Sequence, residues 1–162
     1  MSERAKRILL DTNVWLDNYI DSRPGSAAAR DVLAHACACN IQLLYAVTTI
    51  RDVFYLVASS FKRALRDEGI PIGEAEVAVA RQLGWSCIEN MRTLACAVGA
   101  DESDVWLASK YRSLHGDFED DLILAAAQRA SADALVTNDV KLIQKAPLAA
   151  MTPADWLAFA SG

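Results

Sequence analysis

The sequence has few residues that could bind a soft metal or act as a thiol or imidazole catalyst. It contains four cysteines and two histidines among 162 residues, and the cysteines lack the paired Cys-x-x-Cys spacing of a zinc site. These cysteines are expected to be reduced, small core residues: Cys37, Cys39, Cys87 and Cys96. The histidines, His35 and His115, fit poorly as general bases, and no Cys or Ser nucleophile with a matching His and acid is recognisable.

The chain also lacks a long apolar run and an excess of positive charge. The run Ile8–Leu10 is far too short for a signal peptide. The uncharged stretch Val32–Ile50 contains His35 and Asn40, so it is read as a helix end and a strand, not as a membrane span. Sixteen basic and 21 acidic residues give a net charge of −5, which disfavours nonspecific nucleic-acid binding over the whole surface. We expect a cytoplasmic protein without a membrane segment.

Short apolar runs alternate with helical segments along the chain. With 162 residues, of which 53% are hydrophobic, the sequence has the size and composition of one globular domain, 1–162. Four runs are read as strands, the last of them at a sheet edge: Ile8–Leu10, Ile41–Val47, Ala134–Thr137 and Leu148–Met151. Strands separated by helices predict an α/β fold, a three-layer sandwich with a mainly parallel sheet of about four or five strands.

Helical spacing of apolar residues is clearest between the second and third core strands. It predicts four helices with breaks between them: 50–65, 74–98, 101–112 and 117–130. The domain is therefore expected to carry an extended helical segment of about 61–115.

Acidic residues lie at or near the points where the predicted strands end. Asp11 and Asp139 follow the first and third core strands, and Asp52 lies just inside the helix after the second. The segment 117–121 adds further acids: Asp117, Glu119, Asp120 and Asp121. Because ligands of parallel α/β folds bind beyond the carboxyl ends of the strands, these carboxylates are expected to converge. Such a cluster requires raised pKa values or a cation, and oxygen ligands suit Mg²⁺ or Mn²⁺, which could activate water to hydrolyse a phosphodiester.

Each acidic segment also has a purely structural interpretation. Asp11 could cap a helix and Asp139 a turn, and Asp52 could be a surface charge. The acids of 117–121 could form a solvated first helical turn that complements the helix dipole. Their shared placement at one end of the sheet favours a common site, because independent caps need not all fall there.

Taken in order along the chain, these segments resemble the PIN-domain family. The matching residues are Leu10–Val14, Asp52, Asp117–Asp120 with Ala125–Ala127, Ala132–Asp139 and Met151–Leu157. The resemblance implies a metal-dependent ribonuclease with a parallel sheet flanked by helices. Many small bacterial members are VapC-type toxins of type II toxin–antitoxin pairs, so it also implies an RNA substrate, Mg²⁺ or Mn²⁺ and an antitoxin partner. Homodimers are common in the family.

Carried over residue by residue, the resemblance implies four metal ligands that would also be the catalytic residues: Asp11, Asp52, Asp120 and Asp139. Asn13 and Thr137 would support these carboxylates by hydrogen bonds. Asp117 and Asp121 remain open as alternatives for the third ligand, because helical spacing lets two of the three acids share one face.

Two residues depart from the pattern of the family. Asp52 stands where the family usually has Glu, and its side chain is one methylene shorter. Asn138 stands where the family more often has a basic residue, which leaves the local electrostatic potential more negative. The chain therefore also fits a non-catalytic PIN-like module that binds RNA or protein and has a degenerate metal site. A receiver or phosphatase domain is disfavoured, because the Asp-x-Asp pattern of phosphatases is absent.

Basic and aromatic residues near the acidic segments could contact RNA. The basic residues could form a rim around an acidic centre: Arg51, Lys62, Arg63, Arg66, Lys110, Arg112, Lys141 and Lys145. The aromatic residues could stack on bases: Trp15, Tyr19, Phe54, Tyr55 and Phe118. Helical spacing favours core packing for most of these rings. The segment 61–115 is expected to be a substrate or partner surface.

Overall fold

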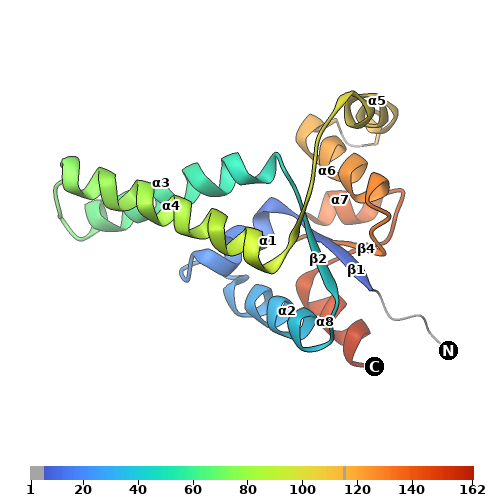
Figure 1. Ribbon diagram of the computed structural model, residues 1–162, viewed down its shortest axis with the longest axis horizontal. Coiled ribbons are helices and arrows are strands. Elements are labelled where there is room, and N and C mark those ends of the chain that lie inside the picture. The colour runs from blue at the N-terminus through green and yellow to red at the C-terminus, as the bar shows by residue number, and fades with distance from the viewer. Residues whose placement is uncertain (1–5, 115) are drawn as a thin grey trace.

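Five parallel strands form one sheet in the computed structural model (Figure 1). They lie in the order β3-β2-β1-β4-β5, and every neighbouring pair is parallel. Their bounds are β1 Arg7–Leu10, β2 Gln42–Ala46, β3 Cys96–Val98, β4 Ala134–Val136 and β5 Ala150–Met151. The structure describes residues 6–114 and 116–162, so the expectations for the first five residues and for His115 lie outside it.

Helices in the described residues cover both faces of this sheet (Figure 1). Their bounds are α1 Thr12–Tyr19, α2 Ser26–Ala38, α3 Thr49–Asp67, α4 Glu74–Leu94, α5 Glu102–Tyr111, α6 Phe118–Arg129, α7 Val140–Lys145 and α8 Pro153–Ser161. Helices α1, α2 and α8 share one hydrophobic core with the sheet, and α6 and α7 share another. The predicted α/β sandwich with a parallel sheet is therefore confirmed.

The central strand β1 shows how the sequence builds these two cores. Ile8 and Leu10 belong to the core with α1, α2 and α8, whereas Leu9 belongs to the core with α6 and α7. All three side chains are fully buried, because alternate residues of a strand point to opposite faces and helices cover both. Asp11, the residue after Leu10, is therefore held in place by a buried strand end.

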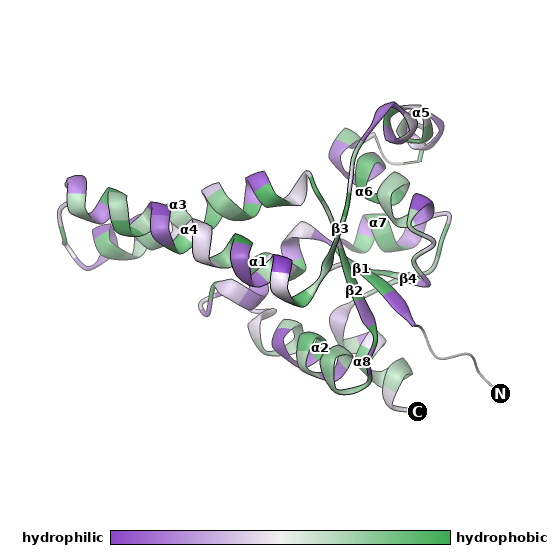
Figure 2. Ribbon diagram, in the orientation of Figure 1, coloured by the Kyte–Doolittle hydropathy of each residue, from purple (hydrophilic) through white to green (hydrophobic). Residues whose placement is uncertain are grey.

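Helices α3 and α4 form a long antiparallel pair that extends away from the sheet (Figure 1). The surface of this α3–α4 hairpin mixes hydrophobic and hydrophilic residues (Figure 2). The helices approach closely at Gly84, where an added Cβ would lie 2.8 Å from Phe54 Cδ2. Glycine is therefore needed at this contact. No helix in the described parts of the chain is long and apolar enough to cross a membrane.

The prediction of a helix over 74–98 is wrong at its C-terminal end, because residues 96–98 form the edge strand β3. Ala95 has an extended backbone, with φ −141° and ψ 160°. Cys96 then pairs with Leu44 of the buried strand β2. The apolar spacing up to Val98 is compatible with a helix, but pairing with a neighbouring strand overrides this local preference. The segment 61–115 is consequently not helical throughout.

The expectation that the cysteines are core residues is wrong for three of them, whereas Cys87 packs against the core. Three are exposed and the last is half-buried, all as free thiols: Cys37, Cys39, Cys96 and Cys87. The buried face of α2 runs along Ala29, Val32 and Ala36, so the cysteines at its end face solvent. His35 packs edge-on against Trp156, with 5.6 Å between the ring centroids, as expected of a packed histidine.

Candidate functional site

Asp11 and Asp139 lie at the carboxyl edge of the sheet, after the neighbouring strands β1 and β4. The parallel register pairs Leu10 with Val136, and the Asp11 amide donates to the Val136 carbonyl at 3.0 Å. Asp139 follows β4 after Thr137 and Asn138, and its negative charge contributes to raising the pKa of Asp11. Adjacent strands therefore bring together two acids that are far apart in the sequence.

The Asp11 carboxylate is buried and is held by hydrogen bonds on both oxygens. Its Oδ1 accepts from the Thr12 amide at 2.6 Å, and its Oδ2 accepts from Asn13 Nδ2 and Thr137 Oγ1, each at 2.7 Å. Only 6% of the residue is exposed. Burial raises the pKa of Asp11, the hydrogen bonds from Thr137 and Thr12 oppose this rise, and the charge of Asp139 adds to it.

Asp139 caps α7 with one oxygen and leaves the other accessible. Its Oδ1 accepts from the amides of Lys141 and Leu142 at 2.8 and 3.0 Å. Its Oδ2 has no hydrogen-bond donor among the described residues. The Asp139 amide itself donates to Thr137 Oγ1 at 3.0 Å. The structural interpretation of Asp139 as a cap is therefore correct for one oxygen, and the other oxygen can accept a ligand.

A second layer of polar residues surrounds Asn13. Asn13 Oδ1 accepts from the Asn138 amide at 3.0 Å, and Asn138 Nδ2 donates to Asp17 Oδ2 at 2.7 Å. The other oxygen of Asp17 accepts from Arg23 Nε at 2.5 Å. Asp17 is 3% exposed, and the sequence interpretation did not include it. Its position four residues after Asn13, on the same face of α1, is the signal that could have identified it.

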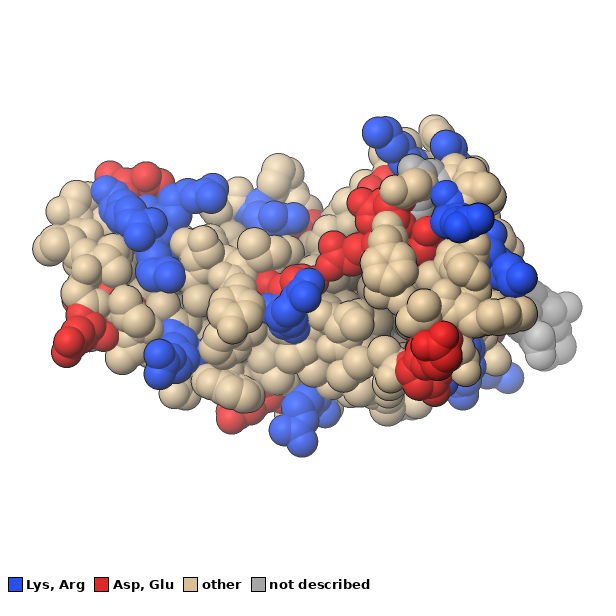
Figure 3. All heavy atoms as spheres, turned by 90° about the horizontal axis from the view of Figure 1, so that it is seen from above, with Lys and Arg blue, Asp and Glu red and all other residues tan. Residues whose placement is uncertain are grey.

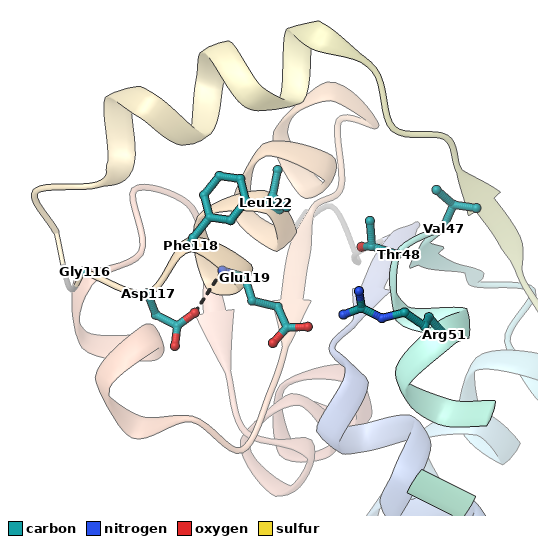
Figure 4. A pocket seen from close by; sticks show the side chains of 8 residues that line it. All are labelled: Val47, Thr48, Arg51, Gly116, Asp117, Phe118, Glu119 and Leu122. Carbon is teal, nitrogen blue, oxygen red and sulfur yellow. Dashed lines mark hydrogen bonds between the residues drawn. The ribbon is translucent and has the colours of Figure 1, made fainter. Parts of the chain in front are cut away.

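The second pair of acids comes from the first turns of two helices. Asp52 lies on α3 and Glu119 on α6, and their carboxyl groups share a hydrogen bond. This hydrogen bond, burial and the charges of Asp52 and Asp117 raise the pKa of Glu119 to about 7, whereas Arg51 opposes the rise. Arg51 Nε also donates to Asp52 Oδ1 at 3.1 Å. Figure 4 shows Arg51 and Glu119 pointing toward one another from the two helices.

The two pairs of acids are connected through the starts of α1 and α3. The hydroxyl groups of Thr12 and Thr49 lie 3.1 Å apart and share a hydrogen bond. Thr12 follows Asp11, and Thr49 begins the helix that carries Asp52. Within the described residues, no three His, Cys, Asp or Glu side chains lie close enough together to form a metal site. The acids are thus arranged as two pairs, Asp11 with Asp139 and Asp52 with Glu119.

The three acids considered for the third ligand have different environments at the start of α6. Asp117 caps the helix, since its Oδ1 accepts from the amides of Glu119 and Asp120 at 2.9 and 3.3 Å. Asp120 is half-buried, and Asp121 is 2% exposed on the buried face of α6. Glu119, which contacts Asp52, belongs to the acidic segment but was not among the ligands implied by the resemblance. The spacing of acids alone does not reveal which of them faces α3.

Glu119→Gln should stabilise the protein at pH 8 but not at pH 5. The pKa of Glu119 is raised from 4.5 to about 7 in the folded state, so ionising Glu119 lowers stability as the pH rises through this window. Because Glu119 is exposed, solvent screening reduces the expected gain to about 1 kcal/mol. Urea unfolding in EDTA at the two pH values measures the change in the free energy of unfolding. Glu89→Gln on α4 is the control. An equal effect of Glu119→Gln at both pH values would contradict the prediction.

Three solved structures have the same fold along nearly the whole chain. A chain of VapBC2 from Rickettsia felis, bound to a DNA fragment from its promoter, has 16% identity and a TM-score of 0.64 over 90% of this chain and 98% of that one. FitAcB from Neisseria gonorrhoeae has 18% identity and a TM-score of 0.60 over 91% and 98%. FitAB bound to an IR36 DNA fragment has 19% identity and a TM-score of 0.59 over 92% and 95%.

Sequence comparison gives the family. No curated protein sequence matches the chain. The family model described as the PIN domain matches residues 7–141, from the first residue of β1 to the first turn of α7. This range includes both pairs of acids. The chain belongs to the PIN-domain family.

Proposed function

We propose that the protein is a divalent-metal-dependent endoribonuclease and the toxin of a toxin–antitoxin pair. Residues 1–162 would form one PIN-like domain that acts in the cytoplasm. The observation that carries the proposal is that two linked pairs of acids, Asp11 with Asp139 and Asp52 with Glu119, lie beyond the carboxyl edge of a parallel sheet. Closely placed acids of this kind are typical of sites that hold a cation and a phosphodiester.

The donor set fits Mg²⁺ or Mn²⁺ in chemical type. Every candidate ligand is a carboxylate, and hard divalent ions prefer oxygen ligands. Asp139 Oδ2 has no donor among the described residues, and the raised pKa values of Asp11 and Glu119 show that negative charge is costly there. Asp11, Asp52, Asp120 and Asp139 would hold the ion. When bound, such an ion neutralises phosphate charge and lowers the pKa of water.

The remaining polar residues orient the candidate ligands. Asn13 and Thr137 fix the plane of the Asp11 carboxylate by donating to Oδ2. The amides at the start of α7 fix Asp139 in the same way. Arg51 lies beside Asp52, where its positive charge attracts the RNA strand. These residues position the acids and the substrate without taking part in a covalent step.

The charge distribution and the similar structures support the choice of RNA and of an antitoxin. Acidic side chains gather in the middle of one face, with basic side chains toward both ends (Figure 3). A phosphate backbone could bind the basic ends while one phosphate reaches the acidic centre. The similar structures are of VapBC2 and FitAB, two of them bound to DNA. An antitoxin partner and a homodimer for this chain belong to the same proposal.

The test is cleavage of a mixed-sequence single-stranded RNA by the purified protein. We expect cleavage with Mg²⁺ or Mn²⁺, none with EDTA, and a loss of about 100-fold or more in Asp120→Asn, since several kcal/mol of charge stabilisation depend on the ligand. Asp31→Asn on the exposed side of α2 is the control and should cleave normally. Cleavage that persists in EDTA would refute the proposal. A larger loss in Asp121→Asn with unchanged stability would move the third ligand to Asp121.

One observation favours a second candidate function, a binding module without catalysis. No three His, Cys, Asp or Glu side chains among the described residues lie close enough together to hold a metal ion, which fits an Asp52 that is shorter than the Glu usual in the family. Such a module would bind RNA or a protein but take up no metal. Isothermal titration of Mn²⁺ separates the two functions: uptake that Asp11→Asn abolishes supports the nuclease, whereas RNA binding without uptake supports the module.

A further inference from the structure

A hollow lies directly beside the acidic pairs, between the start of α3 and the start of α6 (Figure 4). Its volume is about 600 Å³, which is within the range of small-molecule sites. Eight residues line it: Val47, Thr48, Arg51, Gly116, Asp117, Phe118, Glu119 and Leu122. Glu119 and Arg51 both contact Asp52, so the hollow shares a wall with the candidate metal site. The hollow lined by these eight residues is called the base-side hollow.

The base-side hollow has exposed apolar side chains on both walls. Phe118, on the first turn of α6, is 62% exposed, and Val47 on the opposite wall is 39% exposed. Leu122 lies four residues after Phe118 and so extends the same face of the helix. An aromatic ring left in water at the edge of a hollow is available to stack on a flat ligand.

Polar groups of the hollow are suited to the edge of a planar ligand. Arg51 uses Nε to bind Asp52, and within the described residues neither of its Nη groups has a hydrogen-bond acceptor. These groups present fixed, coplanar donors. The Thr48 hydroxyl can both donate and accept hydrogen bonds, and the Glu119 carboxyl adds acceptor oxygens. The edge of a flat ring that carries both donors and acceptors is chemically complementary to these groups.

We infer that the base-side hollow binds one nucleobase of the RNA strand, next to the phosphate at the acidic site, with Phe118 as the stacking surface. This inference rests on the proposed ribonuclease function and adds a subsite to it. Arg51 bonds to the polar edge of the base, and Val47 and Leu122 contact its faces. A peptide of a protein partner is the competing occupant. The exposed aromatic ring together with unused coplanar donors beside a phosphate-binding site favours the nucleotide.

The inference is tested by binding, which does not depend on cleavage. Fluorescence anisotropy measures the Kd of a labelled 12-nucleotide single-stranded RNA of mixed sequence, with Ca²⁺ in place of Mg²⁺ and RNA integrity checked on a gel. Phe118→Ala should weaken binding about tenfold, because stacking contributes about 1–3 kcal/mol per base. Phe118→Trp should retain the wild-type affinity. Phe159→Ala on α8, where the ring is also half exposed, is the matched control and should change nothing.

A second probe assigns the effect to the base. A 12-nucleotide strand that carries ribose and phosphate but no bases should bind wild type and Phe118→Ala equally. Equal affinity of both proteins for the normal RNA would overturn the base site and leave the hollow to a protein partner. A loss that is as large on the base-free strand would also overturn it. Failure of the ribonuclease proposal appears separately, as wild-type protein that binds RNA but cleaves none.

Discussion

Asp11→Asn should lower kcat/KM for RNA cleavage by about 1000-fold or more while leaving the protein as stable as the wild type at pH 7.5. A loss of this size corresponds to about 4 kcal/mol of transition-state stabilisation. Asp11 follows β1 and contacts the end of the neighbouring strand β4, through Thr137 and through its position beside Asp139. Removing its charge would therefore remove one of the proposed metal ligands.

The expected stability follows from the pKa of Asp11. Burial raises this pKa above its ordinary value, so the folded state binds the proton more tightly than the unfolded state does. Stability that depends on Asp11 is fully present at acidic pH and falls as the pH rises through the folded pKa. Asn keeps the shape and removes the cost of burying a charge, but its amide nitrogen replaces one of the two oxygens that accept hydrogen bonds, so the two effects oppose one another. The stability of Asp11→Asn relative to the wild type should thus be lower at pH 4.5 than at pH 7.5, where the two are expected to be equal.

Thermal unfolding in EDTA at the two pH values, together with the cleavage assay, measures both parts of this prediction. Asp31→Asn is again the control, because it lies exposed on α2 away from the site. If Asp11→Asn lowered the melting temperature at pH 7.5 by 10 °C or so, which corresponds to about 3 kcal/mol or more, Asp11 would be a structural cap. A variant that is folded and still cleaves RNA would remove Asp11 from the catalytic residues.

The sequence was sufficient to predict Asp11 and Asp139 as neighbours. Asp11 directly follows a fully apolar run, and Asp139 comes three residues after the end of another. The rule that parallel strands end at one edge places them together without any knowledge of side-chain packing. Asp11 in the structure lies between Asn13 and Thr137, the residues that the PIN resemblance assigned to its support. Local patterns and sheet topology agree at this position, which is why the inference from sequence succeeded.

The contacts of the acids on α6 could not be predicted in the same way. Each residue along a helix turns the side chain by about 100°, so Glu119, Asp120 and Asp121 point in three directions. Which of them faces α3 depends on the rotation of the whole helix, and this is set by the packing of Ile123 and Leu124 into the core. The contact between Glu119 and Asp52 is therefore a result of tertiary packing. The strand β3 was missed for a related reason, because its partner β2 lies fifty or so residues away in the sequence.

Asp17 was missed because its side-chain partners Arg23 and Asn138 lie outside its own helix α1. An aspartate on a helix is usually solvated, and only the approach of Arg23 and Asn138 allows this one to be buried. Asn138, which replaces a basic residue of the family pattern, donates to Asp17 from the loop after β4. The substitution therefore leaves a connected hydrogen-bond network, in which Asn138 also holds Asn13.

Asp17→Ala should lower the free energy of unfolding by about 2 kcal/mol and reduce cleavage about tenfold. Removing one partner of a buried ion pair costs about 3–5 kcal/mol, and the partial exposure of Arg23 reduces this cost. Asn138 loses the acceptor of its side chain, so Asn13 and the carboxylate that it supports become less well oriented. Partners that orient ligand side chains typically contribute about 10–100-fold to activity or metal affinity. Urea unfolding and the cleavage assay measure the two effects.

Gly25→Ala provides an independent way to disturb the same carboxylate. An added Cβ at Gly25 would lie 2.0 Å from Asp17 Oδ2, and because φ is −81° the substitution causes no backbone strain. Both variants should therefore lose stability and activity together. Asp21→Ala is the control, since Asp21 pairs with Arg30 at the surface and should contribute less than about 1 kcal/mol. If Asp17→Ala and Gly25→Ala were destabilised but cleaved RNA normally, the network would support the fold alone and Asn138 would have no part in orienting Asp11.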